Sequence, residues 1–474
     1  MGKKLGIAAA TFLGAVGVAD AADLPTSKPA PAAPAVVASC TSAWDFFTTN
    51  CPLTYYGVTI YGTIDMGVAY QTWGAPFNRD APFGLEYLIQ KNSSKSIFSI
   101  APNGLSQSFI GVKASEPLFG DLSFVFNWQM GFDPYSLRLA NGPLSQEEQN
   151  GLPLALQETN GDSSRAGQWY NGALYAGVSS KTYGTLTIGR QNSLTLDGVN
   201  AYDPMGGSYA FSVIGYSGAT AGVGDTEDTR YSMSAKYRVD IGQFRLAGLY
   251  AFGGYDWNNA ATSAFQIQAG FDVPTGAYGK LSFDAIYSKV YDAVALSSLS
   301  AAQNLLHPGT LAATISDDQS WMLLAKYAIG PWKLYAGYEN IYFAPPSNPQ
   351  TGFTSIAGIP VATADISNTT YNLNQRDLQV FWVGAKYAVT DKLDVATGYY
   401  HYNQSDFHKT PCSNSSASSC SGTLDAVSAM VDWRFAPKFD TYAGVMFSEV
   451  NNGLANGYLH HTSIDPMAGL RFIF

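Results

Sequence analysis

Apolar and polar residues alternate with a period of two along most of the chain from Val58 onward. Between Arg230 and Val239, apolar side chains occupy every second position, and arginine, serine and lysine occupy the positions between them. The same alternation is clear at 58–70 and at 426–435. A period of two with one apolar face is the pattern of a β-strand whose two faces meet different surroundings.

This alternation predicts sixteen strands, most of them about 10–13 residues long, which is enough to cross a bilayer when the strands are tilted. The predicted strands are 58–73, 106–118, 122–132, 169–180, 184–193, 230–241, 244–254, 263–274, 278–292, 318–330, 332–343, 376–389, 392–402, 423–435, 439–449 and 463–474.

The connections between the predicted strands alternate between long and short. Short ones include 119–121, 181–183 and 242–243, whereas 133–168 and 194–229 are long. Long loops on one side and tight turns on the other are typical of transmembrane β-barrels. A soluble β-sandwich also alternates, but it needs neither strands of this length nor this rhythm. We therefore expect an all-β fold, a 16-stranded antiparallel transmembrane β-barrel with long extracellular loops and short periplasmic turns.

The first residues have the pattern of a secretory signal. Lys3 and Lys4 precede an apolar run of about 14 residues, shorter than the ~20 that a membrane-spanning helix needs. A small-residue cleavage site follows at 19–21. We expect a signal peptide over 1–21. Residues 22–57 are then expected to form a periplasmic linker, rich in alanine and proline, with a cysteine-bounded segment at its end, and 58–474 to form the barrel.

Composition and charge are consistent with a barrel and exclude other classes. Charged residues make up 13% of the chain, about half the usual share of a soluble protein. The mean hydropathy is −0.03, too polar for a bundle of membrane helices. The net charge is −10, and removal of residues 1–21 takes away two lysines and one aspartate and leaves −11. Such an acidic chain is not expected to bind nucleic acid.

The four cysteines form two local pairs, and no other motif indicates chemistry. Cys40 and Cys51 are 11 positions apart, and Cys412 and Cys420 are 8 apart. Local disulfides are the expectation in an oxidising compartment. Zinc binding is the alternative, but neither CxxC spacing nor a His–Cys cluster supports it. Hydrolase, metalloprotease and phosphate-binding motifs are absent too, so we expect no enzymatic activity, no metal and no cofactor.

Four segments, in order, resemble the Gram-negative general porins. They are VTIYGTIDMGV at 58–68, SFIGVKASEPLFGDLSFVFNWQMGFD at 108–133, LYAGVSSKTYGTLTIGRQ at 174–191 and GLRFIF at 469–474. The resemblance implies a homotrimer of 16-stranded barrels in the cell outer membrane, in contact with phospholipid and lipopolysaccharide. It also implies that the third loop, here 192–229, folds into the lumen and narrows it, with loop acids facing a basic wall.

The same resemblance nominates residues for the pore constriction. Asp197 and Asp203 match the loop acids, Arg190 and Arg230 match wall arginines on either side of the loop, and Lys113 matches a wall lysine. Phe109 is a departure, because the family often has a wall arginine there. Strict alternation would direct Arg190 towards lipid, so we expect a bulge at Gly189 that turns it inward.

These expectations predict passive diffusion of small hydrophilic solutes and ions through a water-filled channel. The acidic chain and the reduced number of wall arginines predict weak cation selectivity, although charge in the lumen, not total charge, sets selectivity. Two alternatives stay open. The barrel could be a substrate-specific channel, for instance for sugars, with Tyr61 and Phe109 as stacking surfaces, or it could be a surface adhesin or scaffold.

Overall fold

The computed structural model describes residues 39–82, 84–214, 230–253, 263–347, 355–356, 358–368, 375–407 and 418–474. The expected signal peptide (1–21), nearly all of the alanine- and proline-rich stretch that follows it, and Cys412 lie outside these residues. Within the described residues, no helix has the length and apolar character needed to cross a membrane.

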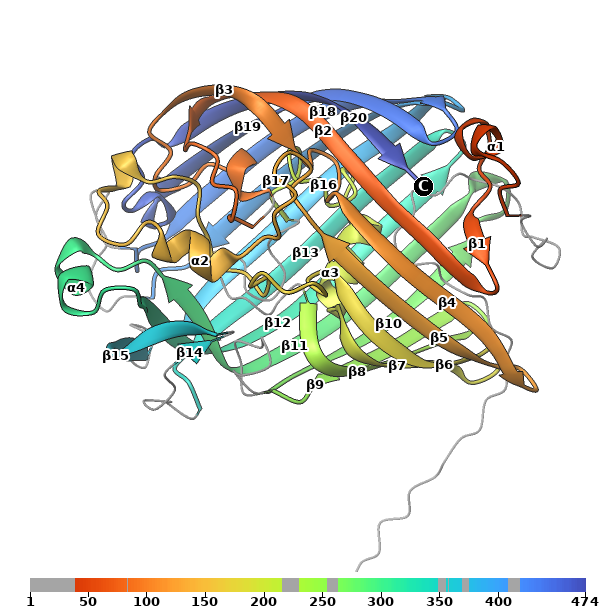
Figure 1. Cartoon of the computed structure of the whole chain (residues 1–474), viewed down its shortest axis with the longest axis horizontal. Coiled ribbons are helices and arrows are strands. Elements are labelled where there is room, and N and C mark those ends of the chain that lie inside the picture. Colours follow the sequence, from red (N-terminus) through yellow and green to blue (C-terminus); the bar gives the residue numbers. More distant parts are fainter. Residues whose placement is uncertain are drawn as a thin grey trace, which may run out of the picture.

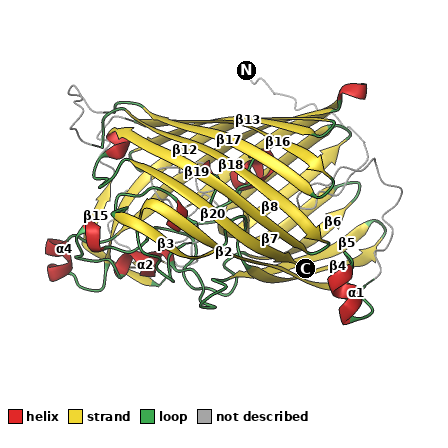
Figure 2. Ribbon diagram, turned by 90° about the horizontal axis from the view of Figure 1, so that it is seen from above, coloured by secondary structure: helices red, strands yellow, loops and turns green. Residues whose placement is uncertain are grey.

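The described strands form a closed antiparallel β-barrel of 16 wall strands, which confirms the predicted fold (Figures 1 and 2). The wall strands are β2 (Val58–Gly74), β3 and β4 (Lys95–Pro102 and Phe109–Phe119, together one wall strand), β5 (Leu122–Gly131), β6 (Ala173–Ser180), β7 (Gly184–Asn192), β8 (Arg230–Ile241), β9 (Phe244–Ala251), β10 (Ser263–Pro274), β11 (Lys280–Ser297), β12 (Leu311–Ile329), β13 (Trp332–Ala344), β16 (Arg376–Thr390), β17 (Leu393–Gln404), β18 (Gly422–Ala436), β19 (Phe439–Asn452) and β20 (Thr462–Ile473).

Short elements lie at the two ends of the barrel, apart from one helix of the third loop, which lies inside the lumen. The α-helices are α1 (Ala43–Thr48), α2 (Gly142–Glu147), α3 (Leu194–Tyr202) and α4 (Ala301–Leu306), the 3-10 helices are Leu85–Tyr87, Leu154–Leu156, Gly276–Tyr278 and Gly453–Ala455, and the short strands are β1 (Leu53–Tyr55), β14 (Ser355–Ile356) and β15 (Ile359–Asn368). Figure 1 shows α1 and the C-terminus at the end with the short turns, and α2 and α4 at the opposite end, with the long loops. We call these ends periplasmic and extracellular.

The barrel closes between its first and last strands. β2 pairs with β20 from Thr63↔Ile473 to Ala69↔Met467. Along β20, Ile464 and Leu470 are exposed, whereas Ser463, Asp465 and Arg471 are buried. This alternation separates a lipid-facing outer surface from an inner surface, as the sequence pattern predicted.

The second wall strand is a correction to the sequence-based prediction, which treated 74–105 as a loop. β3 pairs with the extracellular half of β2 and β4 with its periplasmic half. The break between them folds around Asp65, whose Oδ2 accepts hydrogen bonds from the backbone amides of Leu105 (2.8 Å) and Ser106 (2.9 Å). A buried carboxylate thus replaces the missing strand pairs and satisfies the amides of the break.

The largest group of buried apolar side chains lies inside the barrel, between the third loop and the inner wall. Met322 and Leu324 of β12 are buried, whereas Leu323 between them is exposed on the outer surface, so the buried pair points inward. The third-loop members of this core include Leu194, Val199, Tyr202, Met205, Ala210, Phe211, Val213 and Ile214. Burial of each large apolar side chain contributes roughly 1.5–3 kcal/mol. The loop is therefore held in the lumen by the hydrophobic effect.

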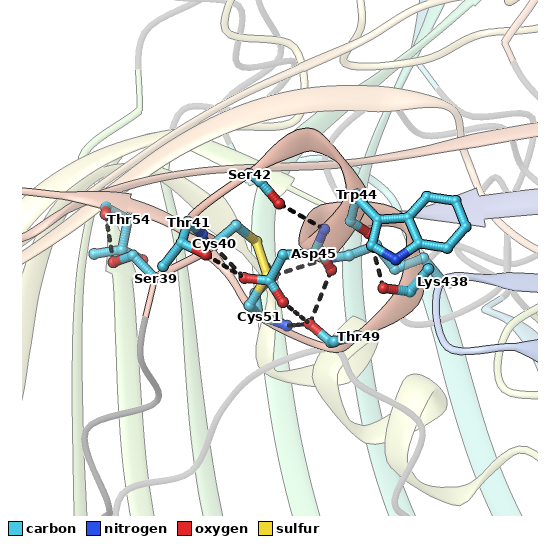
Figure 3. Close-up of a disulfide and its surroundings, with 11 residues drawn as sticks. Ser39, Cys40, Thr41, Ser42, Trp44, Asp45, Thr49, Cys51, Thr54 and Lys438 are labelled. Carbon is cyan, nitrogen blue, oxygen red and sulfur yellow. Dashed lines mark hydrogen bonds between the residues drawn. A yellow bond between two sulfur atoms is a disulfide. The ribbon is translucent and has the colours of Figure 1, made fainter.

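A small disulfide-closed knob, residues 39–57, precedes the barrel (Figure 3). Cys40 and Cys51 are joined by a disulfide. Ser42 caps α1 by accepting a hydrogen bond from the Asp45 amide, and the Asp45 carboxylate accepts one from the Thr41 amide at 2.9 Å. β1 then pairs with the start of β2. Cys420 is also disulfide-bonded.

Candidate channel constriction

The third loop enters the lumen directly from β7. Ser193 caps α3 by accepting a hydrogen bond from the Leu196 amide at 3.0 Å. Leu194 at the start of the helix and Val199 one turn later are buried against the wall. α3 contacts β9, β10, β11, β12 and β13. The cap and the apolar face therefore set both the direction of the helix and the wall that it covers.

Asp197 binds two basic wall residues. Its Oδ2 lies 2.9 Å from Lys236 Nζ and 2.5 Å from Arg238 Nη2, both on β8, and its Oδ1 accepts a hydrogen bond from Asn192. Burial acts to raise the pKa of Asp197, but the charges of Lys236 and Arg238 outweigh it and hold the pKa below its usual value. Asp197 is therefore ionised at neutral pH and fixes α3 to β8.

Asp203 directly follows α3, and its contacts differ from those of Asp197. Its Oδ1 accepts a hydrogen bond from the Tyr400 hydroxyl (2.7 Å) and its Oδ2 one from the Gly207 amide (2.7 Å). Burial raises the pKa of Asp203 to about 6, against the opposing effect of these hydrogen bonds. This acid anchors the loop to β17 and shapes the turn after it, and it does not face open lumen.

Pro204, the next residue of the loop, is held by close packing against two wall glycines. A Cβ at Gly384 would lie 2.5 Å from Pro204 Cγ, and one at Gly398 would lie 3.1 Å from the same atom. Trp382, two positions before Gly384 on β16, donates its indole N–H to the Tyr202 carbonyl at 3.1 Å. Glycine at both wall positions therefore permits the loop backbone to approach β16 and β17.

The described end of the loop continues along the wall to the break between β3 and β4. The Tyr402 hydroxyl donates to the Val213 carbonyl at 3.0 Å. Phe211 packs edge-on against Tyr442 of β19, and the Ala210 amide donates to the Gly104 carbonyl at 2.9 Å. Residues 193–214 thus follow the inner wall past most of its strands and narrow the lumen.

Three predicted or proposed pore residues lie together on the first strands. Lys113 of β4 is exposed, with its Nζ 5.0 Å from the centre of the Tyr61 ring. The Tyr61 hydroxyl donates to Asn127 Oδ1 at 2.5 Å, and Phe109 packs edge-on against Tyr61 at 5.5 Å. Among the described residues, no hydrogen bond or ion pair joins Lys113, Tyr61 or Phe109 to α3, and we take this patch as the open side of the constriction.

Arg190 lies beneath the end of the second loop. Gly189 has a φ of +135°, and the β7–β8 register shifts between Gly189 and Gln191, so the backbone irregularity expected at Gly189 is present. The buried guanidinium donates to Ser232 Oγ at 2.9 Å, to Ser164 Oγ at 2.9 Å and to the Asn171 carbonyl. These contacts tie the loop to the wall, so Arg190 does not line open lumen.

Arg230 begins β8, opposite Asn192 in the β7–β8 ladder. It is partly buried, and its Nε has no hydrogen-bond partner in the described part of the chain. The structure therefore does not bring the six predicted residues into one ring. Arg190, Arg230 and Asp197 lie near one another where the third loop begins and ends, whereas Asp203 is anchored to β17 and Lys113 lies on β4.

The second loop, 132–172, bridges loops from opposite sides of the barrel. Glu148 accepts a hydrogen bond from Asn78 of the first loop at 2.6 Å. Only two residues later, Asn150 donates to the Thr310 carbonyl and accepts from the Leu299 amide, both at 2.7 Å, in the fifth loop. The first and fifth loops follow β2 and β11, half a barrel apart. The second loop therefore crosses the extracellular mouth.

The family match did not nominate most of the charged side chains that face the lumen. Arg245 lies 2.7 Å from Asp272 and 2.8 Å from Asp284, and Asp394 binds both Lys386 and Arg434. The alternation in β8 does place Lys236 and Arg238 on its polar face, so the sequence pattern alone could have nominated these two as lumen-facing residues. We call the set the charge belt: Lys113, Asp197, Lys236, Arg238, Asp240, Arg245, Asp272, Lys280, Asp284, Lys326, Lys333, Lys386, Asp394, Asp432, Arg434, Asp440 and Arg471.

Comparisons with known proteins agree with this architecture. Solved structures with similar folds include an anion-selective porin from Comamonas acidovorans, with a TM-score of 0.56 and 15% identity over 88% of this chain and 99% of that one. OmpT of Vibrio cholerae in its trimer form gives a TM-score of 0.53 and 14% identity over 88% and 99%. No curated protein matches. The profile of the Gram-negative porin family matches residues 30–453. The chain therefore belongs to the Gram-negative porin family and forms an outer-membrane β-barrel.

Proposed function

We propose that this outer-membrane channel lets small hydrophilic solutes and ions diffuse passively, and that it does so as a homotrimer. The observation that carries the proposal is the third loop, which follows the inner wall and narrows a closed barrel without filling it with a separate domain. A narrowed polar lumen sieves solutes by size and charge and needs no energy source. The trimer form of a structurally similar barrel supports the assembly.

The charge belt indicates the sign of the ion preference. Its acids Asp284, Asp394, Asp432 and Asp440 are buried, as are its cations Lys386 and Arg471, whereas Lys113 is exposed to the lumen. Lys280 is exposed too, but it is paired with Asp272. Since accessible lumen charge governs selectivity, the described belt favours anions. We therefore propose weak anion selectivity in place of the cation selectivity that the net charge suggested. The similarity to an anion-selective porin is consistent with this sign but shows only the fold.

Single-channel recording in a planar bilayer under a salt gradient tests the proposal. We expect stepwise conductance with closures in thirds and a reversal potential of the anion-selective sign. Lys113→Gln should lower the anion preference, because it removes an exposed lumen charge. Lys392→Gln, in an exposed periplasmic turn, is the matched control and should not change it.

The other outcomes separate the alternatives. Saturable conductance that a sugar blocks would indicate a substrate-specific channel, and Tyr61 with Phe109 would be its first candidate contact. A folded barrel without conductance would contradict the pore and favour an adhesin or scaffold. A cation-selective reversal potential would keep the pore and contradict the argument from the charge belt.

A further inference from the structure

The N-terminal knob packs against the outer surface of the barrel, at the periplasmic rim. Phe472 and Phe474 share the outward parity of Leu470 on β20, and Phe439 of β19 stacks on Phe472 at 4.7 Å. Phe46 approaches Phe472 at 6.1 Å and Phe474 at 6.4 Å, and the Phe47 ring stacks on Phe472 at 6.1 Å. The knob therefore extends a row of lipid-facing aromatic rings.

The position of the knob is fixed by more than ring contacts. Lys438, in the turn between β18 and β19, donates from Nζ to the Cys51 carbonyl at 2.9 Å and lies 4.5 Å from the centre of the Phe46 ring. β1 pairs with β2 at Val58–Ile60, below the last β2–β20 pair at Thr63. The knob thus fills the part of the wall where β20 has ended.

The knob and the turn that follows it carry large exposed aromatic side chains. Trp44, Tyr55 and Tyr56 are 78%, 75% and 83% exposed, and Phe47 is half exposed. Figure 3 shows the Trp44 ring directed away from the disulfide. Exposure of tryptophan and tyrosine rings to water costs free energy. These residues are enriched in membranes at the border between the hydrocarbon and the headgroups.

We propose that the knob is a membrane-interface anchor, which inserts Trp44, Tyr55 and Tyr56 into the headgroup region of the periplasmic leaflet. The knob continues the lipid-facing aromatic row of the barrel, so we take lipid as the neighbour of its exposed rings. Trp433, Phe435, Phe439, Phe472 and Phe474 form an unbroken series of ring contacts on the outer surface, and Phe46 and Phe47 are its next members. An aromatic girdle lies at the bilayer interface, so the rings of the knob that continue the girdle are expected to lie at the same depth.

The chemistry of the exposed face fits a phospholipid headgroup layer. The tyrosine hydroxyls and the tryptophan N–H can donate to ester carbonyls and phosphates while their rings lie at the edge of the hydrocarbon. The Asp45 carboxylate accepts hydrogen bonds from the Thr41 amide and the Thr49 hydroxyl within the knob. This anchoring role depends on the outer-membrane location of the barrel and not on its conductance.

Fluorescence quenching of Trp44 in a bilayer tests the proposal. The full mature chain is folded into phospholipid vesicles whose acyl chains carry bromine near the headgroup end. The spectrum of Trp44→Phe is subtracted from that of the unaltered protein to isolate Trp44. We expect a blue-shifted Trp44 contribution that these lipids quench about as strongly as the contribution of Trp433, a girdle residue isolated in the same way. Bromine near the methyl end should quench both less.

Matched controls keep the result decisive. Trp169, which is 72% exposed on the second loop, should give an unshifted and unquenched contribution. An unquenched Trp44 with water-like emission would overturn the proposal and place the knob in the periplasm. A blue-shifted but unquenched Trp44 would overturn it in favour of a contact with a second copy of the chain. Trp44→Phe exposes no new surface, so it should fold.

Discussion

At the scale of single residues, the acids of the third loop hold its backbone in place. Asp197 neutralises two wall cations, and Asp203 accepts hydrogen bonds from Tyr400 and from its own turn. A buried carboxylate keeps its charge only with such partners. The transverse field that the family resemblance implied therefore does not arise from these two acids, because their charges are already satisfied.

Replacement of Asp197 by asparagine should make the channel more anion-selective. The change leaves Lys236 and Arg238 without their counter-ion, and removal of one partner from a buried pair costs on the order of 3–5 kcal/mol. We expect a shifted reversal potential and noisier open current, because α3 loses its tie to β8. Asp121→Asn, in a periplasmic turn, is the control. An unchanged reversal potential would show that this pair lies off the permeation path.

Asp203 should make the anchoring of the third loop depend on pH. Its pKa is raised from an ordinary value of 3.8 to about 6, so within that window the anchored loop retains a proton that a released loop would lose. The stabilisation of the anchored loop that Asp203 provides is therefore complete below about pH 4. It is lost as the pH rises through about 6, and it amounts to about 1.4 kcal/mol per pKa unit of the shift. We expect more frequent current flicker at pH 7 than at pH 4.

Asp203→Asn is the matched variant for this prediction. Asparagine carries no titrating group and can still accept a hydrogen bond from Tyr400. Its flicker should not change between pH 4 and pH 7 beyond the response of the remaining groups. Identical pH profiles in the variant and the unaltered protein would rule out Asp203 as the source.

At the scale of elements, period-two alternation was enough to locate every wall strand except the first half of the second one. The eight residues of β3 are too few to cross a bilayer, the strand ends at Pro102, and Asn103 and Gly104 follow it, so the segment has the sequence pattern of a loop. What completes this strand is the Asp65 carboxylate, which binds the break from a different strand. Alternation reports the surroundings of one strand, and it cannot report a contact between two.

The candidate site was less predictable than the barrel, for the same reason. The family match placed Asp203 in the third loop, but its partner Tyr400 lies 197 positions further along the chain. Arg190 was expected to turn inward at Gly189, yet the second loop covers it. Alternation did place Lys236 and Arg238 on a polar face. Only the folded loop shows that Asp197 is the side chain that binds both.

The second loop should act as a sieve at the extracellular mouth. Asn150 joins it to the fifth loop through two hydrogen bonds, so Asn150→Ala removes both and leaves the Leu299 amide without that acceptor. The loss of about 1–3 kcal/mol should let the loops part. We expect faster entry of disaccharides relative to monosaccharides in a liposome-swelling assay. Asn403→Ala, on the outer surface, should leave the ratio unchanged, and so should Asn150→Ala if the loop plays no part in sieving.

At the scale of the whole molecule, the first and last wall strands meet at one seam. The seam pairs β2 with β20 over a short register, from Thr63 to Ala69, and the knob covers its periplasmic edge through Phe46 and Phe47. The inner core reaches the seam as well, since Ala69 of β2 and Met467 of β20 belong to the same buried cluster as the third loop. We therefore expect the knob to supply part of the resistance of the barrel to opening.

Loss of the knob disulfide should lower the temperature at which the barrel opens. A cross-link that closes a loop of about 11 residues restricts the unfolded knob by about 3 kcal/mol in the chain-entropy model. Only part of this reaches the barrel, through the ring contacts with Phe472 and Phe474, so Cys40→Ser with Cys51→Ser should reduce the opening temperature by about 2–4 °C. The heat-dependent shift in electrophoretic mobility of the folded barrel measures it. Both proteins are compared without reductant, because Cys420 is disulfide-bonded too and reductant would act on that bond in either protein. If the double variant and the unaltered protein open at the same temperature, the knob adheres to the seam without stabilising it, and other contacts set the resistance of the barrel to heat.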